Sequence, residues 1–431
     1  MNKSILFLLF SLLSFFIQAQ KLRYGNPSEV QMDSTFIHTK VDSILIDAIR
    51  KKAFPGVQVL VAKKHKIIFH KAYGYHTYDS IQKVQLNDVY DLASVTKIVG
   101  PLPAIMKLYD EGKIDINAPF SNYWKPWKSR TNKKDLTFKE VLAHQAGLAP
   151  YIVFLSEILQ KNKKPKTRFV KSESSKKYTS QAFDGIYIKD RFKNKMYRII
   201  NRSKVSAIKK YKYSGLSFLL YPKMISDISG KNYTEYLQQN FYQPLTALTL
   251  GFTPKKKHFN YAIVPTEVDS FWRKSLTKDW VHDENAALMG GISGNAGLFG
   301  SALDLAKIMQ MYCNYGYYDM KQYISERTLK EFTKVQFPNN GNRRGLGFDK
   351  PLIGNDTLPI NKAYPAPEVS PKSFGHSGFT GTFVWADPEH ELVFIFLSNR
   401  VYPNRSHRNI YNLNIRPKVQ QVFYQAMSKS K

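Results

Sequence analysis

The sequence predicts an α/β (α+β) fold with one antiparallel sheet, built from both ends of the chain and flanked by helices. Two similar stretches near opposite ends support this prediction, "GVQVLVAKKHKIIFHKAYG" (56–74) and "GTFVWADPEHELVFIFLSN" (381–399). In each, β-branched and aromatic runs flank a short polar turn, as in two paired strands. The segments between them have helical spacing. We therefore expect one domain over residues 20–428, with an inserted all-helical subdomain at about 115–245.

The first residues, "MNKSILFLLFSLLSFFIQAQ", are not expected to belong to this domain. Lys3 precedes an apolar run that ends near small residues, a pattern typical of a secretory signal peptide over residues 1–19. The run is short for a membrane span, although an N-terminal anchor is the alternative. We expect a chain secreted across the inner membrane, periplasmic or extracellular.

The middle of the chain is predicted to be mainly helical. Apolar residues recur at helical spacing, and two stretches begin with a capping box, at Thr137 and at Ser301. Cys313, the one cysteine, lies on such a stretch and is expected to be a buried core thiol. The stretches predicted to be helical are 103–114, 137–148, 229–245 and 301–316.

Residues 161–212 form a basic segment with 18 lysines and arginines against three acidic residues. We interpret it as a basic loop or cap, either a mobile lid or a face that docks polyanions. The whole chain carries a net charge of +31, which allows electrostatic contact with an anionic envelope surface or is simply a solvated surface. The predicted signal peptide argues against a nucleic-acid partner, and no stable protein partner is inferred.

A serine and a lysine stand three residues apart in "YDLASVTKIVG" (90–100). Ser94 lies where an apolar segment turns into a helix, and Lys97 shares its face one turn later. A desolvated lysine there can act as a base toward the hydroxyl. The bland alternative is that Ser94 only caps the helix. The spacing alone decides nothing, because it recurs at Ser80, Ser174, Ser206, Ser275 and Ser428.

Other hydrolase signatures are absent from the sequence. It has neither a His-Glu-x-x-His helix nor a Gly-x-Ser-x-Gly elbow. His282 and Asp283 lack metal-ligand spacing, and His144 before "AGL" is expected to be structural. No metal and no cofactor are expected.

Three further segments follow Ser94 in order: "HQAGL" (144–148), "KYSGLSFLL" (212–220) and "FGHSGFTGTFVWADP" (374–388). With them and with "VHDENAALMGGISGNAGLFGSALDLAKIMQMY" (281–312), the chain resembles the serine β-lactamase-like superfamily. This superfamily includes class C β-lactamases, penicillin-binding D,D-peptidases and related esterases. The resemblance runs from about residue 40 to 425 and implies a β-lactamase/transpeptidase-like fold.

The resemblance also implies roles for individual residues. Ser94 would be the acyl-accepting nucleophile, Lys97 its activating partner, and Tyr213 the group that shuttles a proton to the leaving group. His376, Ser377 and Gly378 match the Lys-Thr-Gly motif, where the backbone pairs with substrate. The N–H of Phe379 would join that of Ser94 in an oxyanion hole.

Two positions depart from the family pattern. Gly215 replaces the usual Asn or Asp of the Tyr-x-Asn motif, and Pro101 should kink the helix of Ser94 after its second turn. His376 in place of lysine favours a D-amino-acid peptidase, a carboxypeptidase or an esterase that acts on a small-molecule, peptide or cell-wall substrate. The alternative is a catalytically weak or silent homologue that binds cell-wall material, and Gly215 keeps that alternative open.

Overall fold

The computed structural model describes residues 21–129, 132–257 and 259–428. The predicted signal peptide therefore lies outside the described residues.

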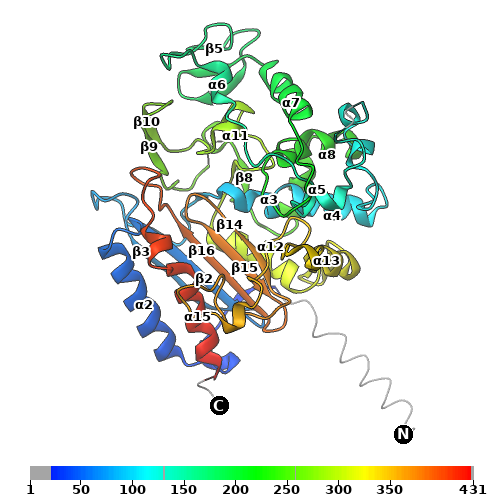
Figure 1. Ribbon diagram of the computed structural model, residues 1–431. Coiled ribbons are helices and arrows are strands. Elements are labelled where there is room, and N and C mark those ends of the chain that lie inside the picture. Colours follow the sequence, from blue (N-terminus) through cyan, green and yellow to red (C-terminus); the bar gives the residue numbers. More distant parts are fainter. Residues whose placement is uncertain (1–20, 130–131, 258, 429–431) are drawn as a thin grey trace, which may run out of the picture.

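A six-stranded sheet with the order β1-β3-β2-β16-β15-β14 forms the centre of the lower part of the molecule (Figure 1). Both predicted hairpins are present, and β2 pairs antiparallel with β16, which joins the two ends of the chain in one sheet. Only the edge pair β1–β3 is parallel, so the sheet is mixed. Its strands are β1 (Arg23–Tyr24), β2 (Gly56–Lys63), β3 (Lys66–Gly74), β14 (Phe374–Ser377), β15 (Phe383–Asp387) and β16 (Leu392–Ser398).

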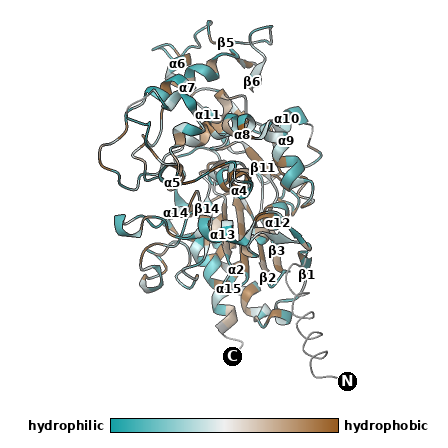
Figure 2. Cartoon of the chain, turned by 90° about the vertical axis from the view of Figure 1, so that its right-hand side faces the viewer, coloured by the Kyte–Doolittle hydropathy of each residue, from teal (hydrophilic) through white to brown (hydrophobic). Residues whose placement is uncertain are grey.

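Helices cover both faces of this sheet because its strands are apolar on both sides. In β2, Val57, Val59 and Val61 pack toward α2 (Ser34–Arg50) and α15 (Ile415–Ser428). Alternate residues of the same strands face the opposite way, toward α12 (Ala302–Cys313). Figure 2 shows the apolar strands inside and mainly hydrophilic residues along α7.

The upper part of the molecule holds most of the other helices (Figure 1). The predicted helix at 229–245 is shorter than expected, because Gly230 ends α8 and a π-helical turn follows α9. The helices above the sheet are α3 (Thr96–Val99), α4 (Pro101–Asp110), α5 (Phe138–Leu142), α6 (Leu155–Ile158), α7 (Phe192–Arg202), α8 (Tyr221–Ser229), α9 (Tyr233–Leu237), α10 (Pro254–Lys257) and α11 (Glu284–Leu288). α13 (Glu326–Thr333) packs against α4, and α14 (Asn409–Asn412) lies against α15 beside the sheet.

The insertion is not purely helical, which corrects one detail of the prediction. Inside the basic segment, β5 (Val170–Lys171), β7 (Ile186–Ile188) and β6 (Ser180–Phe183) form a three-stranded sheet. The turn between β6 and β7 is Asp184-Gly185, a common hairpin turn, with Gly185 at a positive φ. Short strands among many lysines hide this pattern in the sequence.

A second small sheet positions the segment around Ser94. Its order is β4 (Tyr90–Asp91), β11 (Leu298–Gly300) and β8 (Gly251–Phe252). Because β11 pairs with β4, the loop before β11 lies beside the turn that follows β4. Two-stranded hairpins are formed by β9 (Glu267–Asp269) with β10 (Ser275–Thr277) and by β12 (Tyr317–Tyr318) with β13 (Lys321–Gln322).

Candidate active site

Ser94 lies in a single 3-10 turn, Ala93–Val95, directly after β4. Ala93 has a φ of 45°, a left-handed conformation that is unfavourable for a residue with a Cβ. The carboxylate of Asp91 holds this turn, since it accepts hydrogen bonds from the N–H groups of Ala93 (2.8 Å) and His282 (2.6 Å). Local backbone strain of this kind is typical of functional sites.

The helix after Ser94 breaks earlier than expected. α3 is only one turn long, and Gly100 separates it from α4, in which Pro101 is the first residue. A proline at this position has no hydrogen bond to lose, because the first helical N–H has no partner within the helix. The predicted kink is therefore present, but it lies at Gly100, and Ser94 is not the cap of a long helix.

Lys97 is buried against Ser94, with only 2% of its surface exposed. Its Nζ lies 2.9 Å from Ser94 Oγ and 2.8 Å from the carbonyl oxygen of Asn295. The same Nζ lies 5.4 Å from the ring centroids of Tyr213 and Phe218. Lys97 therefore connects the predicted nucleophile, the predicted proton shuttle and the loop before β11.

Tyr213 is held against Lys97 by His144. The backbone N–H of Ser214 donates to His144 Nδ1 (3.2 Å), the N–H of Lys212 donates to the His144 carbonyl (3.0 Å), and the rings of His144 and Tyr213 lie 4.6 Å apart. Burial and the nearby cation Arg344 lower the pKa of His144 well below its usual value, so this ring is neutral. These contacts agree with the structural role expected for His144. The hydroxyl of Tyr213 is buried and has no hydrogen-bond partner in the described part of the chain.

Gly215 faces Asn295 across open space. A Cβ placed on Gly215 would have one neighbour within 4 Å, the Cβ of Asn295 at 4.0 Å. The Asn295 side chain is fixed by Asp283 (3.0 Å) and Ser293 (2.7 Å), while its backbone carbonyl bonds to Lys97. The lysine thus has a second partner although position 215 lacks an amide.

The turn after β14 is clamped onto the segment before Ser94. Thr380 Oγ1 donates to the carbonyl of Asp91 (2.8 Å), and Thr382 Oγ1 donates to that of Leu92 (3.1 Å). A Cβ on Gly378 would lie 2.0 Å from Thr382 Oγ1 and 2.6 Å from the Leu92 oxygen, so only glycine fits there. This contact places the 376–379 segment beside Ser94.

Arg344 is a buried cation that faces His376 and Tyr213. Its Nη2 lies 3.2 Å from His376 Nε2, and its guanidinium carbon lies 5.4 Å from the centroid of the Tyr213 ring. The rings of Tyr213 and His376 are 6.0 Å apart. The structure therefore brings Ser94, Lys97, Tyr213 and His376 together with a guanidinium that the sequence analysis did not single out.

Ser377 and Phe379 lie at the more open side of this group. Ser377 ends β14 and pairs with Phe383. Phe379 is 47% exposed, its ring stacks on that of His282 at 5.8 Å, and its carbonyl accepts a hydrogen bond from Arg400 Nε (2.8 Å). The role of its N–H as an oxyanion donor stays a prediction.

The family model described as "Beta-lactamase" matches residues 41–415. The chain belongs to the beta-lactamase family.

Two kinds of relative agree with this membership. A Salmonella gallinarum (strain 287/91 / NCTC 13346) protein provisionally named D-alanyl-D-alanine carboxypeptidase is 28% identical over 96% of this chain and 92% of its own length. Among solved structures, a penicillin-binding protein homologue from Pyrococcus abyssi has a TM-score of 0.63 at 17% identity, over 90% of this chain and 77% of its own. A family VIII carboxylesterase has a TM-score of 0.58 at 16% identity, over 90% of this chain and 97% of its own. The expected fold class is confirmed, and the chain is a serine hydrolase of the β-lactamase fold.

Sequence reasoning missed several residues around Ser94 in this beta-lactamase family member. Arg344 and Asn295 lie in loops that are about 200 residues or more from Ser94 in the sequence. Their spacing from the other site residues matches no motif that would predict a site. A pair of arginines followed by an aspartate, in "NRRGLGFDK" (342–350), is the one weak signal for Arg344. Their contacts depend on tertiary packing alone.

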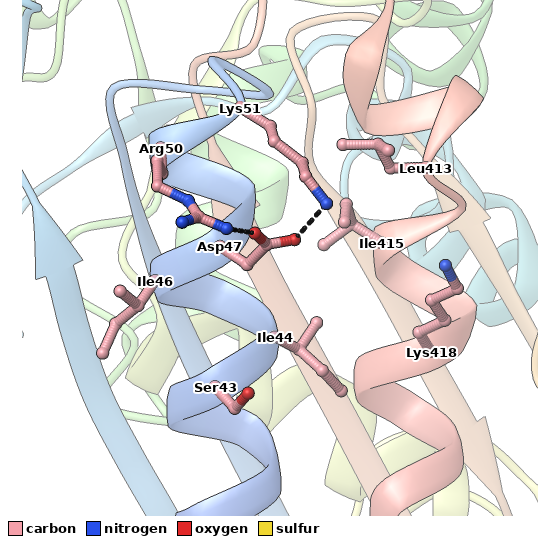
Figure 3. Close-up of a pocket in the computed structure, with 9 residues that line it drawn as sticks. All are labelled: Ser43, Ile44, Ile46, Asp47, Arg50, Lys51, Leu413, Ile415 and Lys418. Carbon is pink, nitrogen blue, oxygen red and sulfur yellow. Dashed lines mark hydrogen bonds and ion pairs between the residues drawn. The ribbon is translucent and has the colours of Figure 1, made fainter.

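The hollow shown in Figure 3 is not part of this group. It measures about 510 Å³, lies between α2 and α15, and has Asp47 paired with Arg50 and Lys51 at its edge. These helices cover the sheet face away from α12, and none of the predicted site residues lines the hollow.

Among the described residues, no group of three or more His, Cys, Asp or Glu side chains gathers closely enough to hold a metal ion. Within the same ranges, no helix has the length and apolarity needed to cross a membrane.

Proposed function

We propose that this protein hydrolyses its substrate through an acyl-enzyme on Ser94. The observation that carries the proposal is the position of Lys97, buried, 2.9 Å from Ser94 Oγ and fixed from behind by the Asn295 carbonyl. A carbonyl oxygen only accepts, so one hydrogen of a neutral Lys97 amine points to Asn295. The lone pair of that amine is then available to the hydroxyl of Ser94.

In the proposed reaction, Lys97 and Tyr213 move the protons. Lys97 takes the proton of Ser94 as Oγ attacks the carbonyl carbon of the substrate, and a tetrahedral oxyanion forms. Tyr213 gives its proton to the leaving group as the scissile bond breaks and regains one from Lys97, which leaves an ester on Ser94. Water then gives a proton to Lys97 as it attacks this ester, and that proton returns to Ser94 Oγ as the acid leaves. The backbone N–H groups of Ser94 and Phe379 are the proposed oxyanion donors.

The substrate class that we propose is a D-amino-acid peptide, cleaved by a peptidase or carboxypeptidase activity, or a small ester. The name of the Salmonella relative supports the first, and the carboxylesterase neighbour supports the second. A fold does not fix its substrate, so these remain two arms of one experiment. His376 also stands where the family motif has a lysine, which favours a peptidase or an esterase over a true β-lactamase.

Intact-mass measurement after exposure to a fluorophosphonate and to a penicillin tests the proposal. We expect a covalent adduct with the fluorophosphonate, located on the peptide that contains Ser94 and absent in Ser94→Ala. Turnover of an acyl-D-Ala-D-Ala peptide and of a small ester is measured in parallel and should also vanish in Ser94→Ala. An adduct on Ser377, or undiminished turnover in Ser94→Ala, overturns the assignment. No adduct and no turnover in the unmodified protein would favour a silent cell-wall-binding homologue.

We further propose that the protein is exported and meets an anionic envelope surface. The proposed signal peptide over residues 1–19 and the net charge of +31 support this location. Expression in a bacterial host followed by fractionation tests it. We expect a chain that starts near residue 20 in the periplasm or the medium, whereas an uncleaved chain in the cytoplasm contradicts it.

A further inference from the structure

His376 is neutral in this site. Its side chain is buried, and burial together with the positive charge of Arg344 lowers its pKa to about 3. A lysine at the same position would carry a positive charge to the edge of the site. The neutral histidine carries no charge, so a positive charge beside Tyr213 has to come from another residue.

The two ring nitrogens of His376 have different partners, and these partners fix the tautomer. Nδ1 lies 2.8 Å from the carbonyl oxygen of Ser377, which only accepts, so Nδ1 carries the hydrogen. Nε2 is then the acceptor for Arg344 Nη2 at 3.2 Å. Any other placement of the proton would set a donor against a donor.

Arg344 is itself held rigidly by the strand that carries His376. Its Nη1 lies 3.0 Å from Asp349 Oδ1, and the backbone of Asp349 pairs in both directions with Gly375 of β14 (2.8 and 3.0 Å). Although burial opposes it, Arg344 and Arg343 hold the pKa of Asp349 below its usual value. Two guanidiniums share one carboxylate, so the cluster keeps one positive charge.

We propose that Arg344 is a positioning residue of this active site, which fixes the Nδ1–H tautomer of His376 and supplies the positive charge beside Tyr213. Lys97 and Arg344 then flank the Tyr213 ring, each at 5.4 Å. Once Lys97 has taken the proton of Ser94, the two groups together stabilise negative charge on the buried phenol oxygen. The kinetic half of this inference rests on the proposed role of Ser94, whereas the tautomer half does not.

The groups that face this corner come from several elements. The amine of Lys97 and the guanidinium of Arg344 lie against the Tyr213 ring, and the adjacent His144 is neutral. The charged and titratable groups around Tyr213 and His376 are Lys97, His144, Tyr211, Arg344 and Asp349.

The test compares Arg344→Met with Arg343→Met in the full chain. Both variants lose one positive charge and one contact to Asp349, but Arg343 faces the Tyr364 ring (5.4 Å) and not His376. We expect Arg344→Met to lower kcat for a small ester and the rate of Ser94 phosphonylation about ten- to a hundredfold, the scale of one lost charge-assisted hydrogen bond. KM should change little. The acid limb of the pH profile, where His376 gains a proton, should move up by about one pH unit, because the positive charge of Arg344 no longer opposes that proton. Arg344→Lys should restore the acid limb and part of the rate. Arg343→Met should change both less than Arg344→Met does, because it leaves the hydrogen bond from Arg344 to His376 in place.

Nitrogen-15 spectra of the histidine rings, with His376→Gln for assignment, read the tautomer without any activity. We expect Nδ1–H in the unmodified protein and a mixture of tautomers in Arg344→Met. An Nε2–H ring in the unmodified protein overturns the inference. So does equal loss of melting temperature in both methionine variants with the acid limb unmoved. If fluorophosphonate does not label the unmodified protein, the proposed function fails, and the ring spectra decide the tautomer and the inference by themselves.

Discussion

The hydroxyl of Tyr213 and the amine of Lys97 are the two groups for which the largest losses are expected. Both lie beside Ser94, and both would move a proton in the proposed reaction. We predict that Lys97→Ala and Tyr213→Phe each lower turnover by ~10²-fold or more, the scale of lost general acid–base catalysis. Steady-state turnover of a small ester measures the loss.

Tyr236→Phe is a matched control for Tyr213→Phe. The Tyr236 hydroxyl is also buried without a partner in the described ranges, but it lies in α9. We expect this variant to keep full turnover. Full turnover in Tyr213→Phe as well would remove the tyrosine from the reaction.

Gly215 provides a second test on a single residue. Asn295 already bonds to Lys97, so an amide at position 215 would add a contact rather than restore a missing one. We predict that Gly215→Asn raises turnover of an ester or an amide by up to about tenfold, the lower end for a hydrogen bond to a charged group. The melting temperature should not fall, because the space beside Asn295 is open.

The control for this change is Gly215→Ala, which fills space without adding an amide and should leave turnover unchanged. If Gly215→Asn lowers the turnover of both substrates while the fold stays intact, the glycine serves a substrate that needs this space.

At the level of single elements, the β9–β10 hairpin gives the clearest dependence on pH. Although burial opposes it, hydrogen bonds from His282 and Arg405 lower the pKa of Glu267 from 4.5 to about 2. Because this pKa is depressed in the folded state, ionised Glu267 stabilises the fold fully above about pH 4.5. That stabilisation is lost as the pH falls toward 2.

We predict that Glu267→Gln removes about 2 kcal/mol of stability at pH 6 and little at pH 2.5, since Arg405 is 43% exposed and solvent screens part of the pairing. Urea unfolding at the two pH values measures it. Glu173→Gln, at an exposed glutamate of the basic segment, should have no such effect. Equal losses at both pH values would mean that shape, and not charge, matters at Glu267.

The elements also show how much of the fold could be predicted from the sequence. The hairpins at 56–74 and 381–399 could be predicted because long β-branched runs flank polar turns, and the capping box at Thr137 begins α5 as expected. Ser301 caps α12 without the predicted box, because its N–H donates to Thr249 Oγ1 and not to Asp304. The strands β5 to β7 could not, because two to four residues among lysines carry little periodicity. Arg344 and Asn295 reach Ser94 only through the pairing of distant segments, which single-sequence patterns do not contain.

For the whole molecule, the two ends of the chain build one sheet and the insertion stands above it, with α3, the helix that follows Ser94, between them (Figure 1). The 378–382 turn of the C-terminal hairpin region is clamped to Asp91 and Leu92, so the sheet edge and the Ser94 turn are held together. The basic segment lies in the insertion and contributes none of the groups that contact Ser94 or Lys97. Chemistry and surface charge are therefore separable.

This separation leads to a prediction about surface association. We expect the protein to bind anionic phosphatidylglycerol vesicles and to dissociate as salt rises toward physiological strength, because exposed charges are screened beyond about 8 Å there. The triple variant Lys171→Glu, Lys176→Glu, Lys193→Glu should weaken retention on the vesicles at least tenfold, because each lysine near an anionic lipid surface contributes roughly 1 kcal/mol to binding. Turnover of a small ester should stay within about threefold. All three side chains are exposed.

The matched control is Lys40→Glu, Lys52→Glu, Lys64→Glu, which changes the net charge equally at three exposed lysines outside the insertion. If retention depended only on net charge, both triple variants would lose it to the same extent, and the basic segment would have no special role. If ester turnover collapses in the first variant alone, the segment acts as a lid over Ser94. A charge remote from the reacting atoms should not by itself alter the chemistry of the buried groups Lys97, Tyr213 and Arg344.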